Sequence, residues 1–100
     1  MSGRSGETEV NADTIITRGQ KHVETVADGE VVLMHIDTGR FFTLSGTGRR
    51  AWELMAEPTS VDAIVARLTD EYDVDDATCR AEIFALCRQL EAGALIDVSA

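Results

Sequence analysis

A chain of 100 residues, 44% of them hydrophobic, is long enough for one small domain and too short for a large active site of several parts. Nine basic residues against eighteen acidic ones give a net charge of -9. An acidic chain repels a phosphate backbone, and the sequence contains no local basic stripe to offset this, so nucleic acid is disfavoured as a partner. No segment approaches the roughly 18 apolar residues of a membrane helix, and the N-terminus lacks a secretory signal, so we expect a cytoplasmic protein without a membrane partner.

The first segment is rich in Gly, Ser and Glu and shows no hydrophobic periodicity. This composition is typical of a segment that cannot bury enough apolar surface to become ordered. We therefore expect a disordered tail at residues 1–11 and one folded domain at residues 12–100. At the start of this domain, residues 15–17 either form a short strand or pack along the sheet that follows.

Three runs of β-forming residues come next, separated by two turn signals. Asp28-Gly29 fits a type I′ turn, and Gly39 suits the left-handed position of a three-residue hairpin loop. The middle run is apolar on both faces, which is typical of a middle strand covered on both sides. We predict a three-stranded antiparallel meander of residues 22–27, 30–36 and 40–44. In its last strand, Phe42 and Leu44 share one face, and Phe41 and Thr43 share the other.

The hydrophobic period becomes helical after the third strand. Ser45 is expected to cap a helix at residues 46–56, which Glu57-Pro58 ends. Gly46 and Gly48 fall in its first turn, where each costs about 1 kcal/mol relative to Ala. We therefore attribute these two glycines to a close approach of another part of the backbone.

Thr59 or Ser60 is expected to cap a second helix, whose apolar residues recur at the spacing of one helical face. Asp75 and Asp76 favour the start of a third helix through its dipole, with Asp75 at its cap, and Gly93 is expected at the C′ position that stops the helix. Residues 94–98 form a last extended segment. The order predicts an α+β fold, a winged helix-turn-helix with a three-stranded antiparallel sheet followed by three helices. The apolar face of the second helix consists of Val61, Ile64, Val65, Leu68 and Tyr72.

No group of residues has the spacing of a catalytic or metal site. His22 and His35 lie in strands without a base or ligand partner at a useful spacing. Cys79 and Cys87 are eight residues apart on one expected helix, so their Cα atoms lie roughly 12 Å apart, beyond the roughly 7 Å reach of a disulfide. We expect two small buried thiols, no metal, no cofactor and no enzymatic activity.

The residues that remain favour recognition of a peptide or protein. If the third strand ends the meander, its edge presents unpaired N–H and C=O groups to which a peptide can add. On the third helix, Phe84 lies about 100° around from Ile83, off the core face. Phe84 therefore either lines a groove beside the strand or extends the core. The expected core face of this helix is Cys79, Ile83, Leu86, Cys87 and Leu90.

Because winged helices often bind DNA, DNA binding is an alternative function, in which the third helix would be the recognition helix. Arg80 and Arg88 on that helix are outnumbered by Asp76, Glu82 and Glu91. A net negative surface disfavours insertion into a groove of the duplex.

Several short motifs occur in a fixed order along the chain. TGRFFTLS at residues 38–45 is followed by Gly48 and Trp52, then by VDAI at residues 61–64 and AGALI at residues 92–96. In this order and spacing they resemble the PqqD-like family, the recognition elements of ribosomally synthesised and post-translationally modified peptides (RiPPs). The resemblance covers residues 23–96.

The resemblance implies a winged helix-turn-helix with no catalysis of its own. It implies a peptide chaperone that binds the leader segment of a precursor peptide as an extra β-strand and presents it to maturation enzymes. The leader is expected in a groove between the third strand and the third helix. Carried onto this chain, the leader-binding residues are Arg40, Phe41, Phe42, Thr43 and Leu44 on the strand and Arg80, Ile83, Phe84 and Cys87 on the helix.

The pathway is indicated by the residues that follow the third strand. The family member that serves pyrroloquinoline quinone synthesis typically has Leu-Asn-x-Ser-Ala there, whereas this chain has Leu-Ser-Gly-Thr-Gly at residues 44–48. The chain more closely resembles the stand-alone proteins of lasso-peptide clusters, whose partners are a separate leader peptidase and an ATP-dependent macrolactam cyclase. Pyrroloquinoline quinone synthesis or another modified-peptide pathway is the alternative.

Overall fold

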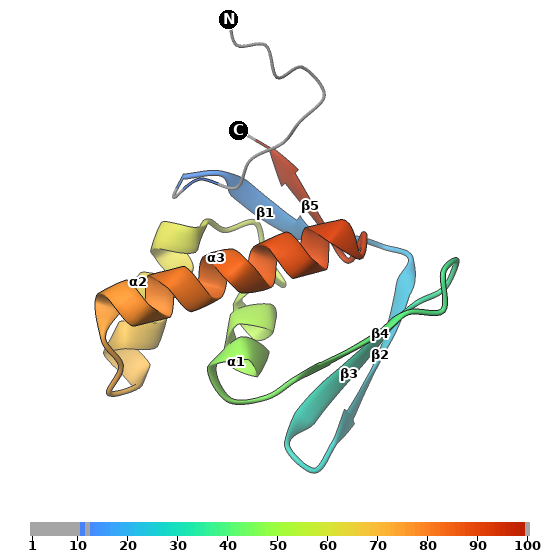
Figure 1. The fold of residues 1–100 in the computed structure, drawn as a ribbon, viewed down its shortest axis with the longest axis horizontal. Coiled ribbons are helices and arrows are strands. Elements are labelled where there is room, and N and C mark those ends of the chain that lie inside the picture. Colours follow the sequence, from blue (N-terminus) through green and yellow to red (C-terminus); the bar gives the residue numbers. More distant parts are fainter. Residues whose placement is uncertain (1–10, 12, 100) are drawn as a thin grey trace, which may run out of the picture.

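The computed structural model describes Asn11 and residues 13–99. The tail expected at residues 1–11 therefore lies, apart from Asn11, outside the described residues. Figure 1 shows one long helix lying across the molecule, with a shorter helix beneath it and a sheet that extends to one side. No helix within the described residues is long and apolar enough to cross a membrane. In chain order the elements are β1 (Ile15–Arg18), β2 (His22–Ala27), β3 (Glu30–His35), β4 (Phe41–Leu44), α1 (Gly46–Leu54), α2 (Val61–Glu71), α3 (Asp76–Ala92) and β5 (Ile96–Ser99).

Strands β2, β3 and β4 form an antiparallel sheet with β3 in the middle. Asp28 and Gly29, between β2 and β3, have φ angles of 53° and 81°, as the predicted type I′ turn requires. Gly39, in the loop before β4, has a φ of 72°, which is also left-handed. The predicted meander is confirmed, although β3 ends at His35 and β4 begins at Phe41, one residue inside the predicted bounds in each case.

The two faces of this sheet are unequally covered. Val31 and Leu33 on the inner face are 2% and 0% exposed and belong to the core that the helices share. The outer face carries Val23, Met34 and Phe41 in one row across the three strands, and Val23 and Phe41 are 49% and 67% exposed. The prediction that the middle strand is covered on both sides is therefore wrong, because a run of apolar residues does not reveal what covers it.

A second, two-stranded sheet joins the two ends of the described chain. β1 and β5 pair antiparallel, with Ile15 opposite Ser99. The N–H of Ile16 donates to the carbonyl of Thr59 at 2.6 Å, and the N–H of Thr59 donates back to Ile16 at 3.1 Å. Of the two alternatives for residues 15–17, the short strand is confirmed. The extended segment expected at residues 94–98 is the strand Ile96–Ser99, which is the partner of β1.

The helix starts are fixed by side chains that accept hydrogen bonds from the first turn. Ser60 Oγ accepts from the N–H of Ala63 at 3.2 Å, and Asp75 Oδ2 accepts from the N–H of Thr78 at 2.9 Å. These two predicted caps are confirmed. Ser45 also occupies the cap position of α1, but its side chain makes no capping hydrogen bond.

The glycines of α1 differ from the prediction. Gly46 has a φ of 57°, and a Cβ at this position would meet nothing within 4 Å. At Gly48 the nearest atom to such a Cβ is a methyl carbon of Leu44 at 4.0 Å, an ordinary contact. The expected close backbone approach is therefore wrong, and Gly46 serves the left-handed turn that starts the helix.

The core lies between the inner face of the sheet and the three helices. Val61, Ile64, Val65 and Leu68 of α2 are all 0% exposed, which confirms this part of the predicted apolar face. Tyr72, the last residue assigned to that face, lies just beyond α2 and is 39% exposed.

Arg18 connects the two sheets to α1. Its guanidinium carbon lies 4.3 Å from the centre of the buried Trp52 ring, and its Nη2 donates to the Trp52 carbonyl at 2.6 Å. The indole N–H of Trp52 donates to Glu24 on β2 at 3.2 Å, and that carboxylate lies 3.6 Å from Arg18. This continuous polar network fixes the orientation of the β2-β3-β4 sheet against the helices.

Candidate functional site

β4 is an edge strand of the three-stranded sheet, as is β2 on the other side, and β4 is the edge strand that contacts the end of α3. Within the described part of the chain, β4 pairs only with β3, so its outer edge has no strand partner. Its side chains alternate, since Phe42 and Leu44 turn toward the core and Phe41 and Thr43 turn outward. Arg40, immediately before the strand, is exposed. An edge of this kind can accept an extended peptide through main-chain hydrogen bonds.

The helix residues predicted for the same site divide into two pairs. Ile83 and Cys87 are 2% and 0% exposed and belong to the core. Arg80 and Phe84 are partly exposed, and Phe84 packs against the core without being enclosed by it. Of these four predicted residues, only Arg80 and Phe84 therefore present side-chain surface, whereas Ile83 and Cys87 belong to the core.

The inward side of β4 meets the C-terminal end of α3 at Gly93. A Cβ placed on Gly93 would lie 2.6 Å and 2.7 Å from two ring carbons of Phe42. The φ of Gly93 is -85°, a value that any residue adopts, and the left-handed residue is Ala94 with a φ of 59°. The prediction that Gly93 is the C′ residue is therefore wrong by one position: Gly93 is the C-cap, where it provides space for an aromatic ring, and Ala94 is the C′ residue.

The hydrogen bonds after α3 form a Schellman motif. The N–H of Ala94 donates to Glu91 at 3.0 Å, and the N–H of Leu95 donates to Leu90 at 2.9 Å. These bonds hold Gly93 at the C-cap and turn the chain into β5. Both sides of the Phe42 contact are thus anchored, one by the sheet and the other by the helix end.

Charges near the site are unequally available. Arg80 Nη1 donates to Asp62 at 2.6 Å, and Arg80 Nε lies 3.6 Å from Asp76. The hydrogen bond to Asp62 raises the pKa of the Arg80 guanidinium, and Asp76 adds to this effect. Arg40 and Arg88 make no ion pair with any residue that the structure describes. The pairing of Arg80 with α2 was not predicted, because no local pattern links residues 62 and 80.

The two thiols are free and buried, as predicted. Burial raises the pKa of Cys87 to about 11 and also raises the pKa of Cys79, where Glu82 and Asp76 add to the effect. Both groups are therefore protonated thiols near neutral pH, and neither is activated as a nucleophile or metal ligand.

Both histidines have structural neighbours. His35 is 5% exposed, and its Nδ1 accepts hydrogen bonds from the N–H groups of Asp37 and Thr38 at 3.2 Å and 3.4 Å. The His22 ring packs edge-on against the Trp52 ring, with 5.3 Å between the two ring centres. Among Asn11 and residues 13–99, no cluster of three or more His, Cys, Asp or Glu side chains could hold a metal ion.

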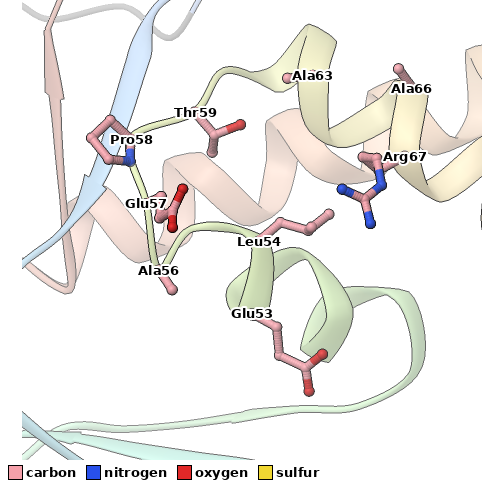
Figure 2. A pocket seen from close by; sticks show the side chains of 9 residues that line it. All are labelled: Glu53, Leu54, Ala56, Glu57, Pro58, Thr59, Ala63, Ala66 and Arg67. Atoms are coloured by element: carbon pink, nitrogen blue, oxygen red, sulfur yellow. The ribbon is translucent and has the colours of Figure 1, made fainter.

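A cavity of about 570 Å³ lies between the end of α1 and α2, away from the predicted leader-binding residues. Figure 2 shows that Leu54, Ala63 and Ala66 line it, with Glu53 and Arg67 also at its wall. None of the predicted leader-binding residues contributes to this cavity.

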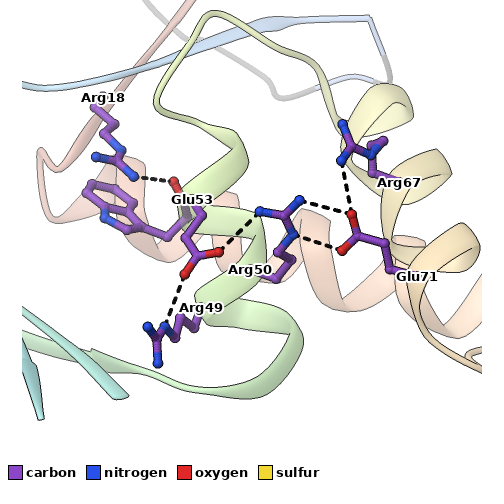
Figure 3. Close-up of polar contacts among 7 residues, drawn as sticks. Arg18, Arg49, Arg50, Glu53, Arg67 and Glu71 are labelled. Carbon is purple, nitrogen blue, oxygen red and sulfur yellow. Dashed lines mark hydrogen bonds and ion pairs between the residues drawn. The ribbon is translucent and has the colours of Figure 1, made fainter. Parts of the chain in front are cut away.

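An exposed ion-pair cluster connects α1 to α2 (Figure 3). Arg50 donates to both carboxylate oxygens of Glu71 at 2.8 Å and 2.9 Å, and Arg67 donates to the same carboxylate at 3.0 Å. Glu53 accepts from Arg49 and Arg50 at 3.1 Å and 3.2 Å. The hydrogen bond from Arg50 lowers the pKa of Glu71 to about 2, and Arg67 reinforces this shift.

The fold and the site together define a small winged helix-turn-helix domain that presents the open edge of an aromatic strand near its longest helix. The chain belongs to the PqqD family, because the family model described as coenzyme PQQ synthesis protein D (PqqD) matches residues 30–96. No curated protein matches the chain.

Two solved structures share the fold. One, described as TbiB1 in complex with the TbiA(beta) leader peptide, is 32% identical, with a TM-score of 0.73 over 81% of this chain and 94% of that chain. The other, described as lasso peptide synthetase B1 complexed with the leader peptide, is 20% identical, with a TM-score of 0.72 over 82% of this chain and 96% of that chain. The predicted fold class and family are confirmed by these similarities.

Proposed function

We propose that this protein binds the leader segment of a ribosomally made precursor peptide as an additional strand on β4 and presents it to maturation enzymes without modifying it. The observation that carries the proposal is the unpaired outer edge of β4, since an extended peptide can satisfy its free N–H and C=O groups. The 32% identical relative TbiB1 is described in complex with a leader peptide, which supports the same kind of ligand here.

The proposed site combines main-chain pairing on the strand with side-chain contacts on the helix. Phe42 and Phe84 are half-buried aromatic residues that can lose further exposed surface when an apolar leader side chain covers them. Ile83 and Cys87 belong to the core cluster against which Phe84 packs. Arg40 is available to an acidic leader residue, whereas Arg80 would first have to leave Asp62. The proposed leader-binding residues are Arg40, Phe41, Phe42, Thr43, Leu44, Arg80, Ile83, Phe84 and Cys87.

The pathway that we propose is lasso-peptide maturation in the cytoplasm. The partners would be a leader peptidase and an ATP-dependent macrolactam cyclase, to which this protein delivers the precursor. The Leu-Ser-Gly-Thr-Gly sequence after the aromatic residues of β4 supports this choice, and the chain shares its fold with the structure described as lasso peptide synthetase B1 complexed with the leader peptide. Delivery to the enzymes of pyrroloquinoline quinone synthesis is the second candidate, because the matching family model carries that description.

The test is a titration of isotope-labelled protein with the synthetic leader of the precursor encoded beside it, followed by backbone amide shifts. We expect the largest shifts in β4 and along the Arg80, Phe84 and Arg88 side of α3. A peptide with the same composition in scrambled order is the control and should leave these amides unchanged. Shifts confined to residues 70–76 would place the site elsewhere, and no binding of any neighbouring precursor would refute the proposal.

A further inference from the structure

We propose that Gly93 is a positioning residue for the leader site, which it serves by leaving room for the Phe42 ring at the end of α3. This inference rests on the proposed function, because it concerns the same strand. It assigns to Gly93, in the AGALI motif, a role in ligand affinity rather than in helix termination.

The first step is the space at Gly93. The nearest atoms to an added Cβ are Phe42 Cζ at 2.6 Å and Phe42 Cε1 at 2.7 Å, both closer than carbon atoms can pack. Gly93 is buried, and its φ of -85° imposes no need for glycine. The requirement at this position is therefore for the absence of a side chain.

The second step is that the backbones on both sides of the contact are held. Phe42 pairs with Leu33 of the middle strand, and Leu33 is 0% exposed. Gly93 is held by its N–H bond to Gln89 at 3.0 Å and by the Schellman bonds that follow. Neither backbone is free to retreat, so a methyl group at residue 93 has to displace the ring.

The third step is the direction of the consequence. The two ring atoms are at the far end of a side chain that is only half-buried, so the ring can rotate out while the fold persists. A displaced ring changes the surface beside the edge of β4 that the leader strand would follow. The substitution Gly93→Ala should therefore weaken leader binding more than it weakens folding.

The experiment compares four variants with the wild type in titrations with the synthetic leader peptide of the neighbouring precursor. They are Gly93→Ala, Phe42→Leu, the double variant, and Gly48→Ala. Gly48→Ala is the matched control, because its added Cβ makes only an ordinary 4.0 Å contact with Leu44. Fluorescence of Trp52, the only tryptophan, verifies that each variant is folded at the titration temperature.

We expect Gly93→Ala to weaken binding about tenfold and Gly48→Ala to change it less than about twofold. In the Phe42→Leu background, where the shorter side chain leaves room, the same Gly93→Ala change should cost less than about twofold. A purely structural role would not produce this dependence on residue 42 in folded proteins. Equal binding by wild type and Gly93→Ala overturns the inference, as does an equal loss in both backgrounds. Absence of binding by the wild type instead refutes the proposed function itself.

Discussion

At the scale of single residues, two neighbours at the end of α3 have exchanged the roles that their residue types suggest. The glycine is needed for space, and the alanine adopts the left-handed conformation. Gly93 has an ordinary φ of -85° and no room for a methyl group. Ala94 carries a methyl group and has a φ of 59°, a conformation in which glycine is usual. The need for space beside Phe42 thus explains the glycine at residue 93, whereas the left-handed conformation of Ala94 strains the backbone.

The substitution Ala94→Gly should stabilise the protein. The left-handed conformation costs a residue with a Cβ about 1–2 kcal/mol. The greater freedom of glycine in the unfolded chain offsets about 0.4–1 kcal/mol of this. We expect a net gain of about 0.5–1 kcal/mol, measured as a higher midpoint in urea. Ala92→Gly, in the last helical turn, is the control and should lower the midpoint, and a loss at both positions would contradict the strain argument.

The two cysteines should react with thiol reagents only when the protein opens. Cys87 is 0% exposed with a pKa of about 11, so its reactive thiolate is scarce near neutral pH. An aromatic disulfide reagent should label both thiols at once in denaturant and slowly in native buffer. Cys87→Ser should cost about 1–3 kcal/mol, because it buries a hydroxyl among apolar neighbours. Rapid stoichiometric labelling of the folded protein would show that the thiols are more accessible than the structure indicates.

At the scale of elements, one face of α3 packs in the core, and a second face is proposed to contact the leader peptide. One face supplies Cys79, Ile83, Cys87 and Leu90 to the core. Phe84 lies off this face and is half-buried, so the helix is apolar beyond the stripe that its packing needs. This additional apolar surface, at Phe84, is on the side of α3 that we propose for the leader.

Phe84→Ala should weaken leader binding about tenfold, because truncation of an aromatic interface residue often costs more than about 1 kcal/mol. Leu86→Ala is the matched control. Leu86 is also partly buried on α3, but two residues along a helix rotate it about 200° from Phe84. We expect it to lower stability while affinity, measured by calorimetry, changes less than about twofold. Equal losses of affinity in the two variants would argue against a directional role for Phe84.

The link between α1 and α2 should depend on pH through Glu71. Arg50 lowers the pKa of Glu71 in the folded state to about 2, below its ordinary value. The stabilisation is therefore complete above the ordinary pKa of a glutamate and is lost as the pH falls toward about 2. Urea midpoints of wild type and Glu71→Gln should differ most near about pH 6 and converge only as the pH falls to about 2. Glu30→Gln removes an exposed carboxylate that forms no ion pair with a described residue, so it is the control for the loss of one negative charge. A constant difference for Glu71→Gln would contradict the assignment.

At the scale of the whole molecule, the features predicted from the sequence are those with local signals. The turn at Asp28-Gly29 and the caps Ser60 and Asp75 depend on neighbouring residues, and all three are confirmed. The pairing of β1 with β5 and of Arg80 with Asp62 joins distant residues, so no local pattern announces it. Likewise, the sequence shows that residue 93 is glycine but does not show that Phe42 occupies the space beside it.

The charge of the whole chain predicts that duplex DNA does not bind at physiological salt. With a net charge of -9, the protein repels the phosphate backbone, and Arg80 on α3 is already paired with Asp62 and Asp76. A gel-shift titration with random duplex should show no complex at micromolar protein. A micromolar shift that weakens with added salt would restore the alternative of a winged-helix reader.

The pairing of β1 with β5 also bears on how this domain can be combined with others. Ile15 and Ser99 are opposite partners in that sheet, and Figure 1 shows it at the other end of the molecule from the β2-β3 turn. A short peptide could therefore close Ser99 onto Ile15, and new ends could be opened at an exposed turn such as Asp28-Gly29. The domain is thus a good candidate for circular permutation and for insertion into a larger enzyme as a self-contained module.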